Sequence, residues 1–139
     1  MNTSSMKSDI KTPEVTDVIV AAVPRPDGKS DELWDIYIVN LRGEAMENIL
    51  ITSQGYGSID GRDKTTTVLR HFHQRIGPGD HLKVEPIQTE LFGIQNEYWI
   101  SFNATGGMLD KRYVFAAHQI GADKLTNVPG LDRPGVFLR

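Results

Sequence analysis

Three histidines offer the most direct route to chemistry in this sequence. His71 and His73 stand two positions apart, and His81 follows a Gly-Pro-Gly-Asp turn. Residues i and i+2 of a β-strand project from the same face, so the first two imidazoles should lie side by side. Neutral imidazole is a good ligand for divalent transition metals. The spacing raises the hypothesis of a metal-binding protein, or a small metal-dependent enzyme, in which a transition metal is held by His71, His73 and His81.

A plainer interpretation of the histidines needs no cofactor. If Phe72 faces a core together with Ile76, the two histidines of the pair lie on the solvated face beside Arg75. The metal-binding strands of cupins also place a carboxylate a few residues after the second histidine, and residues 74–77 contain none. We therefore expect surface histidines, with metal binding as the alternative.

Other motifs that could carry chemistry give weaker signals. The run Gly55–Gly61 matches neither the dinucleotide-binding nor the P-loop spacing, and a strand rather than a helix is expected after it. It is typical of a long hairpin loop, in which Tyr56 is an exposed contact residue. Asp60 and Asp63 are interpreted as solvated turn acids, because nothing indicates the concave site that acid–base catalysis requires. The serines lack a nucleophile-elbow signature.

Composition narrows the function further. The chain has 139 residues, a formal net charge of -3 and no cysteine. We expect one domain without disulfides or thiolate chemistry, in which a metal would need histidine and carboxylate ligands. The densest basic stretch is too weak a patch for a dedicated nucleic-acid binder. A tRNA-associated accessory protein is the weaker alternative, and it would use Arg70, His71, His73 and Arg75.

Export and membrane signals are not evident in the sequence. No segment approaches the roughly 20 apolar residues of a membrane span. The first apolar run, Val18–Val23, is too short for a signal peptide. The lack of cysteine agrees with a reducing compartment. We therefore expect a cytoplasmic protein with no membrane partner.

The elements that must position these residues follow a strand pattern. Seven short segments alternate apolar and polar residues, and turn residues separate most of them. The segments are Val18–Val23, Leu33–Arg42, Asn48–Ser53, Thr65–Ile76, His81–Ile87, Glu97–Asn103 and Lys111–His118. Seven short strands predict an all-β fold, an immunoglobulin-like antiparallel β-sandwich. A jelly roll, which needs about eight strands, is the alternative.

The ends of the chain differ in pattern from its middle. Residues 1–14 are rich in Ser, Thr and Lys without periodicity, which predicts a flexible N-terminal lead. The sandwich domain is expected over residues 15–120. Residues 121–139 carry several Pro and Gly residues, which predict an irregular C-terminal tail packed on the domain.

The aromatic residues suggest a surface for a partner. The segment Leu33–Leu41 is apolar on both faces, as in a central strand or in one covered by a loop or a partner chain. Large aromatics on an exposed sheet face anchor partner surfaces. We expect a non-enzymatic binding or protein-interaction module. Its partner would be a second copy of the chain or another protein, bound through a sheet face or an edge strand. The candidate contact residues are Tyr37, Tyr56, Trp99, Arg70 and Arg75.

Four segments carry a family resemblance. Asp31–Asn40, Ser53–Gly57, Val68–His71 and Asn96–Ser101 together resemble a family of short bacterial proteins of unassigned function, and the resemblance covers most of the chain from about residue 16. Some members of that family are labelled as phenylalanyl-tRNA synthetase subunits. The residues here do not support that label, because the Arg-bearing ATP motifs of a class II synthetase core do not occur. The resemblance implies a bacterial β-sandwich-like protein and no catalytic residues.

Overall fold

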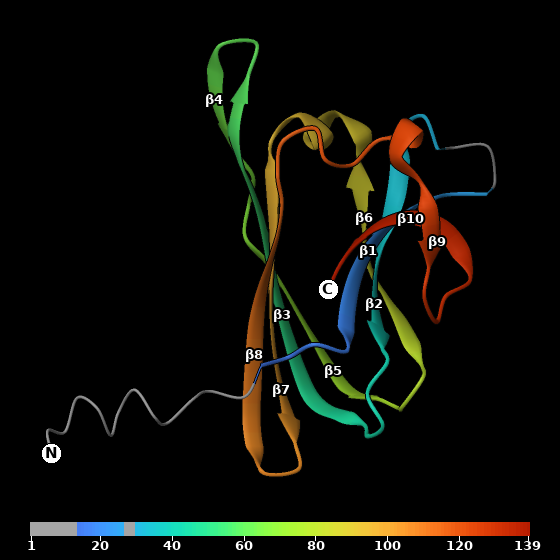
Figure 1. The fold of residues 1–139 in the computed structure, drawn as a ribbon. Coiled ribbons are helices and arrows are strands. Elements are labelled where there is room, and N and C mark those ends of the chain that lie inside the picture. Colours follow the sequence, from blue (N-terminus) through green and yellow to red (C-terminus); the bar gives the residue numbers. More distant parts are fainter. Residues whose placement is uncertain (1–13, 27–29) are drawn as a thin grey trace, which may run out of the picture.

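The structure is a computed structural model that describes residues 14–26 and 30–139 of the chain (Figure 1). The predicted flexible lead, residues 1–14, lies outside the described residues except for Glu14. The described part contains ten strands and two short 3-10 helices. No helix in this part is both long enough and apolar enough to span a membrane.

Short strands and turns alternate along the chain. The strands are β1 (Val18–Pro24), β2 (Leu33–Asn40), β3 (Met46–Ile59), β4 (Arg62–Thr65), β5 (Leu69–Ile76), β6 (His81–Gln88), β7 (Gln95–Ala104), β8 (Gly107–Phe115), β9 (Thr126–Val128) and β10 (Arg133–Leu138). The 3-10 helices are η1 (Thr89–Gly93) and η2 (Ala122–Lys124). Ten strands in the described residues exceed the seven expected, because β4, β9 and β10 are added. The predicted segment Thr65–Ile76 corresponds to β5 and shares only Thr65 with β4.

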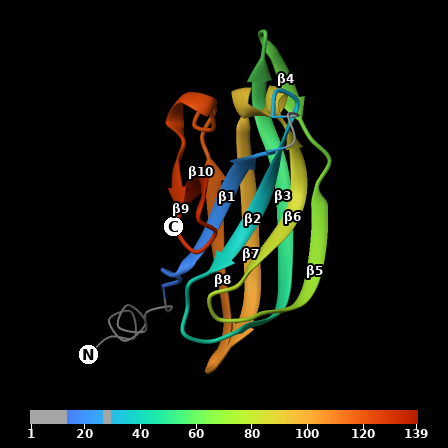
Figure 2. The ribbon, with the colours of Figure 1, turned by 90° about the vertical axis from the view of Figure 1, so that its right-hand side faces the viewer.

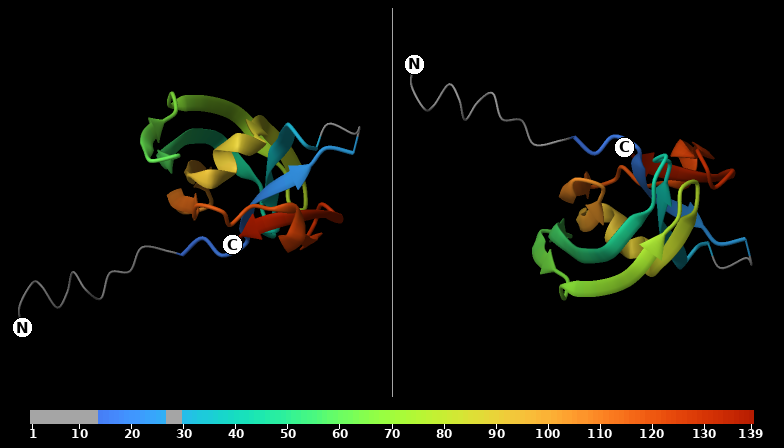
Figure 3. Two further views of the ribbon diagram at one scale, coloured as in Figure 1. Left: turned by 90° about the horizontal axis from the view of Figure 1, so that it is seen from above. Right: turned by 90° about the horizontal axis from the view of Figure 1, so that it is seen from below.

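Two antiparallel sheets form the molecule. The first sheet has the order β6-β2-β1-β10-β9, and the second has the order β4-β3-β7-β8, with β5 also paired to β3. Figures 2 and 3 show these sheets as two facing layers. The core between them is built from fully buried side chains of both sheets, among them Ile36, Ile51 and Phe102. The prediction of an all-β sandwich is confirmed.

Strand β3 has 14 residues and serves two partners along the same edge. Its first part, from Met46 to Ser53, pairs with β5, and its last part, from Tyr56 to Ile59, pairs with β4. The turn at Gly77–Asp80 then carries the chain from β5 in the second sheet to β6 in the first. As a result, β5 and β6 follow one another in sequence but belong to the edges of different sheets.

The prediction of a long hairpin loop at Gly55–Gly61 is wrong. Strand β3 continues through most of this run, and only Asp60 and Gly61 form the turn, with positive φ angles of 53° and 77°. A Cβ atom on Gly57 would come within 3.0 Å of the side chain of Ile94. Gly57 is therefore a site of close packing inside a strand, which composition alone cannot distinguish from a loop.

The C-terminal segment 121–139 corrects a second prediction, since it is not an irregular tail. Strand β10 pairs with β1, and β9 pairs with β10, so this segment completes the first sheet. Val128 and Leu131 also pack with Tyr37 and Val39 in a second apolar cluster on the outer face of that sheet. Strand β2 is apolar on both faces because the C-terminal segment packs against its outer face.

Pro134 and Gly135 obscured strand β10 in the sequence. Proline cannot donate to a ladder and is tolerated only where its missing N–H is not needed. Pro134 pairs with Asn127 of β9, whereas the ladder with β1 uses only Val136 to Leu138. The proline therefore lies outside the ladder with β1, so its missing N–H removes no hydrogen bond from that ladder.

Candidate functional site

The histidine pair lies on the opposite side of β5 from the one expected. His71 pairs with Ile51 and His73 with Ile49, both of which point into the core. Phe72 points outward instead and is 63% exposed. The expectation that Phe72 faces the core with Ile76 is therefore wrong.

The cause of this inversion is Asn48 on the neighbouring strand. Asn48 has a φ of 49°, and β3 carries an irregularity in its ladder with β7 between Glu47 and Leu50. Glu47 and Asn48 are both exposed, so the alternation of β3 shifts by one position here, and that of β5 shifts with it. Counting by twos from Ile76 along β5 consequently assigns Phe72 to the wrong face.

The three histidines do not converge. His71 Nε2 lies 2.7 Å from Glu85 Oε1. His81 lies on β6 in the first sheet, where its ring makes an edge contact with Tyr37 at a centroid distance of 5.9 Å. Within residues 14–26 and 30–139, no group of three or more His, Cys, Asp or Glu side chains could hold a metal ion. The predicted geometry of a three-histidine site is therefore wrong.

Glu85 is the centre of the polar contacts that do form. Its side chain is 10% exposed, and its Oε1 atom accepts a hydrogen bond of 2.9 Å from Ser53 Oγ. The same oxygen contacts the His71 imidazole. In a Ser-His-Asp triad the serine passes its proton to the histidine. Here the Ser53 hydroxyl group donates to the carboxylate, so the three side chains do not form that triad.

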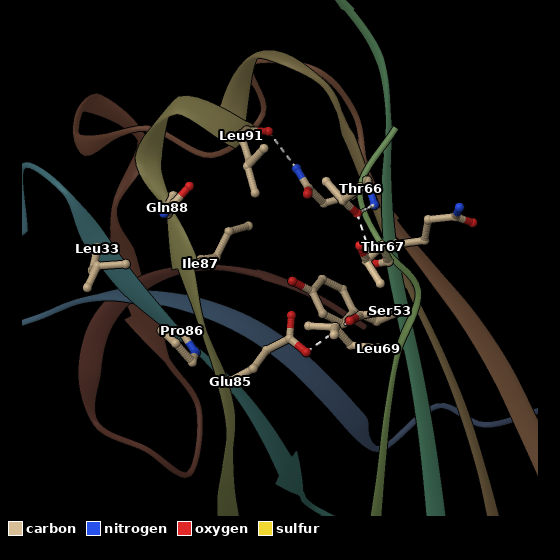
Figure 4. Close-up of a pocket in the computed structure, with 14 residues that line it drawn as sticks. Leu33, Ser53, Thr66, Thr67, Leu69, Glu85, Pro86, Ile87, Gln88 and Leu91 are labelled. Atoms are coloured by element: carbon tan, nitrogen blue, oxygen red, sulfur yellow. Dashed lines mark hydrogen bonds between the residues drawn. The ribbon is translucent and has the colours of Figure 1, made fainter. Parts of the chain in front are cut away.

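A cleft of about 340 Å³ opens beside this network, between β6 of the first sheet and β3 with the β4–β5 loop of the second. Figure 4 shows Ser53 and Glu85 directed toward one another across it. The lining residues are Leu33, Ser53, Gln54, Gly55, Thr66, Thr67, Leu69, Glu85, Pro86, Ile87, Gln88, Leu91, Asn96 and Tyr98. The cleft therefore combines apolar walls with a small number of polar groups, as ligand pockets do.

The Tyr98 hydroxyl group belongs to this cleft and stays protonated. Burial raises the pKa of Tyr98 well above its ordinary value, and the negative charge of Glu85 raises that pKa further. Neutral Tyr98 and the carboxylate of Glu85 thus lie in the same apolar surroundings.

Strand separation accounts for the cleft. Residues 66–68 leave the edge of β3 between its pairing with β4 and its pairing with β5. Thr66 is held there, since its Oγ1 accepts a 2.7 Å hydrogen bond from the Gly55 N–H and its own N–H donates to the Gly55 carbonyl. Helix η1 closes one end, where Leu91 joins the lining.

The outer face of the second sheet forms a separate surface. Cross-strand pairing places side chains in two adjacent rows over β5, β3, β7 and β8. One row is Phe72, Leu50, Ser101 and Asp110, and the next is Arg70, Thr52, Trp99 and Arg112. The large apolar side chains of these rows are strongly exposed: Phe72 63%, Trp99 45% and Leu50 43%.

Four of the predicted contact residues lie on or beside this face. Trp99 and Arg70 belong to the rows themselves. Arg75 lies at one end, 3.4 Å from Glu47. Tyr56 lies farther along β3, where its hydroxyl group donates to Glu97 over 3.3 Å.

Tyr37 is the exception, and its prediction as a partner contact is wrong. It is only 6% exposed, because the C-terminal segment covers it. Its hydroxyl group accepts a hydrogen bond of 3.1 Å from Arg133, and the guanidinium of that residue lies 5.6 Å from the ring centroid.

Sequence reasoning missed Glu85, Ser53, Leu50 and the exposure of Phe72. Ser53 and Glu85 are 32 positions apart and come from different sheets, so no local spacing announces their contact. Leu50 stands in the middle of the apolar run Ile49–Ile51, so the sequence alone does not show that it faces outward. No family model matches this chain, and no curated protein sequence matches it either.

Proposed function

We propose that this protein is a non-enzymatic interaction module that self-associates through the outer face of its second sheet. The observation that carries the proposal is the cluster of Phe72, Leu50 and Trp99, which lies exposed on three adjacent strands. Single exposed apolar residues are ordinary, but a contiguous group marks an interaction surface. Tryptophan in particular is enriched among the residues that dominate binding energy.

The charges on this face favour a second copy of the chain as the partner. Arg70 lies on the β5 margin and Asp110 on the β8 margin, and neither forms an ion pair with any of the described residues. A two-fold axis parallel to the strands, between β3 and β7, would place β5 of one copy over β8 of the other. Arg70 of each copy would then lie over β8 of the other copy, opposite Arg112, which is already paired with Glu97, and one row along the strand from Asp110. The apolar side chains would lie between these margins.

The size of the face sets the strength of the association. Four strands spaced about 4.8 Å apart and the eight residues of β5 give a face of roughly 500 Å² per copy. This is at the lower limit for specific interfaces and typical of weak, reversible ones. We therefore expect a dimer that forms at high protein concentration and dissociates on dilution.

Sedimentation equilibrium over a wide concentration range tests the proposal. The wild-type protein should shift from monomer to dimer, and the double variant Phe72→Ser, Trp99→Ser should remain monomeric. Leu69→Ser is a matched control, because Leu69 is equally exposed, at 46%, but lines the cleft. All three positions are exposed, so these substitutions should change stability by only about 0.5 kcal/mol each. A wild-type protein that stays monomeric throughout would refute the proposal.

A charge exchange tests the orientation of the two copies. Arg70→Asp should weaken the dimer, because it replaces the cation that lies one row from Asp110 of the second copy with another acidic side chain. The double variant Arg70→Asp, Asp110→Arg should restore the association. If the double variant is as weak as the single variant, the two-fold arrangement described above is wrong.

A further inference from the structure

Several polar side chains of the cleft beside Glu85 present hydrogen-bond acceptors, while the protonated Tyr98 hydroxyl group is a donor in the same lining. The Ser53 hydroxyl group directs its proton to Glu85. Both amide hydrogens of Asn96 are engaged, since its Nδ2 donates to the carbonyl oxygens of Leu91 at 2.8 Å and Ile94 at 3.1 Å. Thr66 Oγ1 donates to the Thr67 carbonyl over 3.3 Å. These three side chains therefore offer a ligand only lone pairs.

The charge of the cleft has one sign. Glu85 is the one ionisable carboxylate among the lining residues, and no Lys or Arg lines the cleft. Its Oε1 atom receives two contacts, whereas no hydrogen bond from the described residues reaches Oε2. Ser53 and His71 compensate the nine-tenths buried carboxylate at Oε1, and a further donor would compensate it at Oε2. The free oxygen is thus a position for a cationic donor.

The remaining walls fit an aliphatic group. Leu33, Leu69, Ile87 and Leu91 supply apolar surface around the polar groups. A volume of about 340 Å³ is at the small end of ligand pockets. Such a cavity has room for a short alkyl chain with one polar head.

We propose that this cleft binds a small organic cation, a primary amine on a short alkyl chain, with its ammonium group donating to Glu85 Oε2 and Ser53 Oγ. The proposal is independent of self-association, since the cleft is on the inner side of β3 and the apolar cluster is on its outer side. The same alkylammonium chemistry is present in a free amine and in a lysine side chain, and the experiment distinguishes these sources.

The experiment is a titration of the isotopically labelled full chain followed by protein-detected NMR. The probes are n-hexylamine, n-hexanol, n-hexanoate and N-acetyl-lysine amide at neutral pH. Hexylamine should shift the amide signals of residues 53–55, 66–69 and 85–88. Hexanol should bind at least about tenfold more weakly, because it lacks the charge-assisted hydrogen bond to Glu85. Hexanoate should not bind, since it would bring a second negative charge.

The lysine derivative identifies the source of the ammonium group. A free amine as the natural ligand predicts that hexylamine binds more tightly than N-acetyl-lysine amide, because the amide groups of the latter must leave water at an apolar wall. Tighter binding of the lysine derivative would overturn the small-molecule assignment and indicate recognition of a protein side chain. Equal affinity of hexanol and hexylamine would overturn the proposal as a whole.

Two variants test the assigned atoms. Glu85→Gln should weaken hexylamine binding at least about tenfold, and the matched control Glu97→Gln should leave it unchanged, because Glu97 pairs with Arg112 on the outer face. Leu69→Trp fills the cleft at an exposed position without altering Glu85, and it should abolish binding in a folded protein. Undiminished binding in both Glu85→Gln and Leu69→Trp would contradict the site.

Discussion

Asn40 is the buried amide on which the junction of the two sheets depends. Its side chain is fully buried, and Nδ2 lies 3.0 to 3.1 Å from the carbonyl oxygens of Glu44, Ile76 and Gly77. Its Oδ1 accepts a 3.0 Å hydrogen bond from the Arg42 N–H. One side chain thus bonds backbone groups of two connections between the sheets, β2–β3 and β5–β6.

Asn40→Ala should lower the free energy of unfolding by about 3 kcal/mol, because it leaves several buried backbone groups without partners. Urea unfolding followed by circular dichroism measures this loss. The control Asn127→Ala, at an exposed position of β9, should change stability by about 0.5 kcal/mol or less. A loss below about 1 kcal/mol for Asn40→Ala would mean that water replaces the amide.

Ionisation of Tyr98 should lower the free energy of unfolding at alkaline pH. Burial, and then the charge of Glu85, raises the pKa of Tyr98 in the folded protein, whereas the unfolded value is about 10. A raised folded pKa contributes stability that is fully present below pH of about 10 and is lost as the pH rises further. Burial also raises the pKa of Tyr113, which acts in the same direction.

Tyr98→Phe should therefore make the fall in stability above pH of about 10 less steep, by up to about 1.4 kcal/mol per pH unit. Urea unfolding at several pH values between about 8 and 11 provides the measurement. Tyr113 remains in the variant, so part of the alkaline loss should persist. An identical pH dependence in the variant and the wild type would show that Tyr98 ionises freely in the folded state.

At the level of elements, alternation predicted the strands that have one buried face. The predicted segments Glu97–Asn103 and His81–Ile87 lie within β7 and β6 and differ from them by at most two residues at an end. Strand β10 escaped prediction because Pro134 and Gly135 are common in irregular segments, and only the pairing with β1 and β9 makes them a strand. The strand propensity of a segment depends on its own residues, whereas strand pairing depends on segments that are distant in the sequence.

The candidate site was less predictable than the strands. A single left-handed residue, Asn48, reverses which side of β5 faces the core, and no composition rule locates such a bulge. His71 was identified as a candidate ligand, but its actual partner is Glu85 on the edge of the other sheet. The sequence identifies His71 as a residue that can bind a ligand. Its contact with Glu85 depends on how strand β5 packs beside strand β6, which the sequence does not show.

The loop between β9 and β10 provides a stability test at the element level. Gly130 has a φ of 78°, and a Cβ atom there would lie 2.7 Å from Val39 and 2.8 Å from Leu41. Gly61 has nearly the same φ, 77°, with nothing within 4 Å of a Cβ. The two glycines therefore share the same backbone requirement and differ in the space around them.

Gly61→Ala should cost about 1 kcal/mol from the left-handed backbone alone. Gly130→Ala should cost about 3 kcal/mol, since the added methyl group also overpacks the apolar cluster around Tyr37. Chemical denaturation of both variants measures the difference. Equal costs would mean that the loop moves away from Val39 without penalty.

At the scale of the whole molecule, the second sheet keeps its two proposed surfaces apart. Successive residues of a strand point to opposite faces, so Leu50 and Thr52 lie outside while Ile51 and Ser53 lie inside. Self-association on the outer face and amine binding on the inner face would therefore use alternate residues of the same strand. Each can be removed by substitution without touching the other.

The pairing of β1 with β10 has a mechanical consequence. The ladder runs from Val20 opposite Leu138 to Ala22 opposite Val136, so both chain ends leave from the same end of the ladder. A force that separates the ends would load one residue pair at a time and open the ladder like a zipper, rather than shear all its bonds together. The C-terminal segment would peel away first and uncover Tyr37 and Val39 while the core between the sheets was still closed. This sandwich therefore resists heat and denaturant through its whole core, but it resists tension only through the last pair of its closing strand.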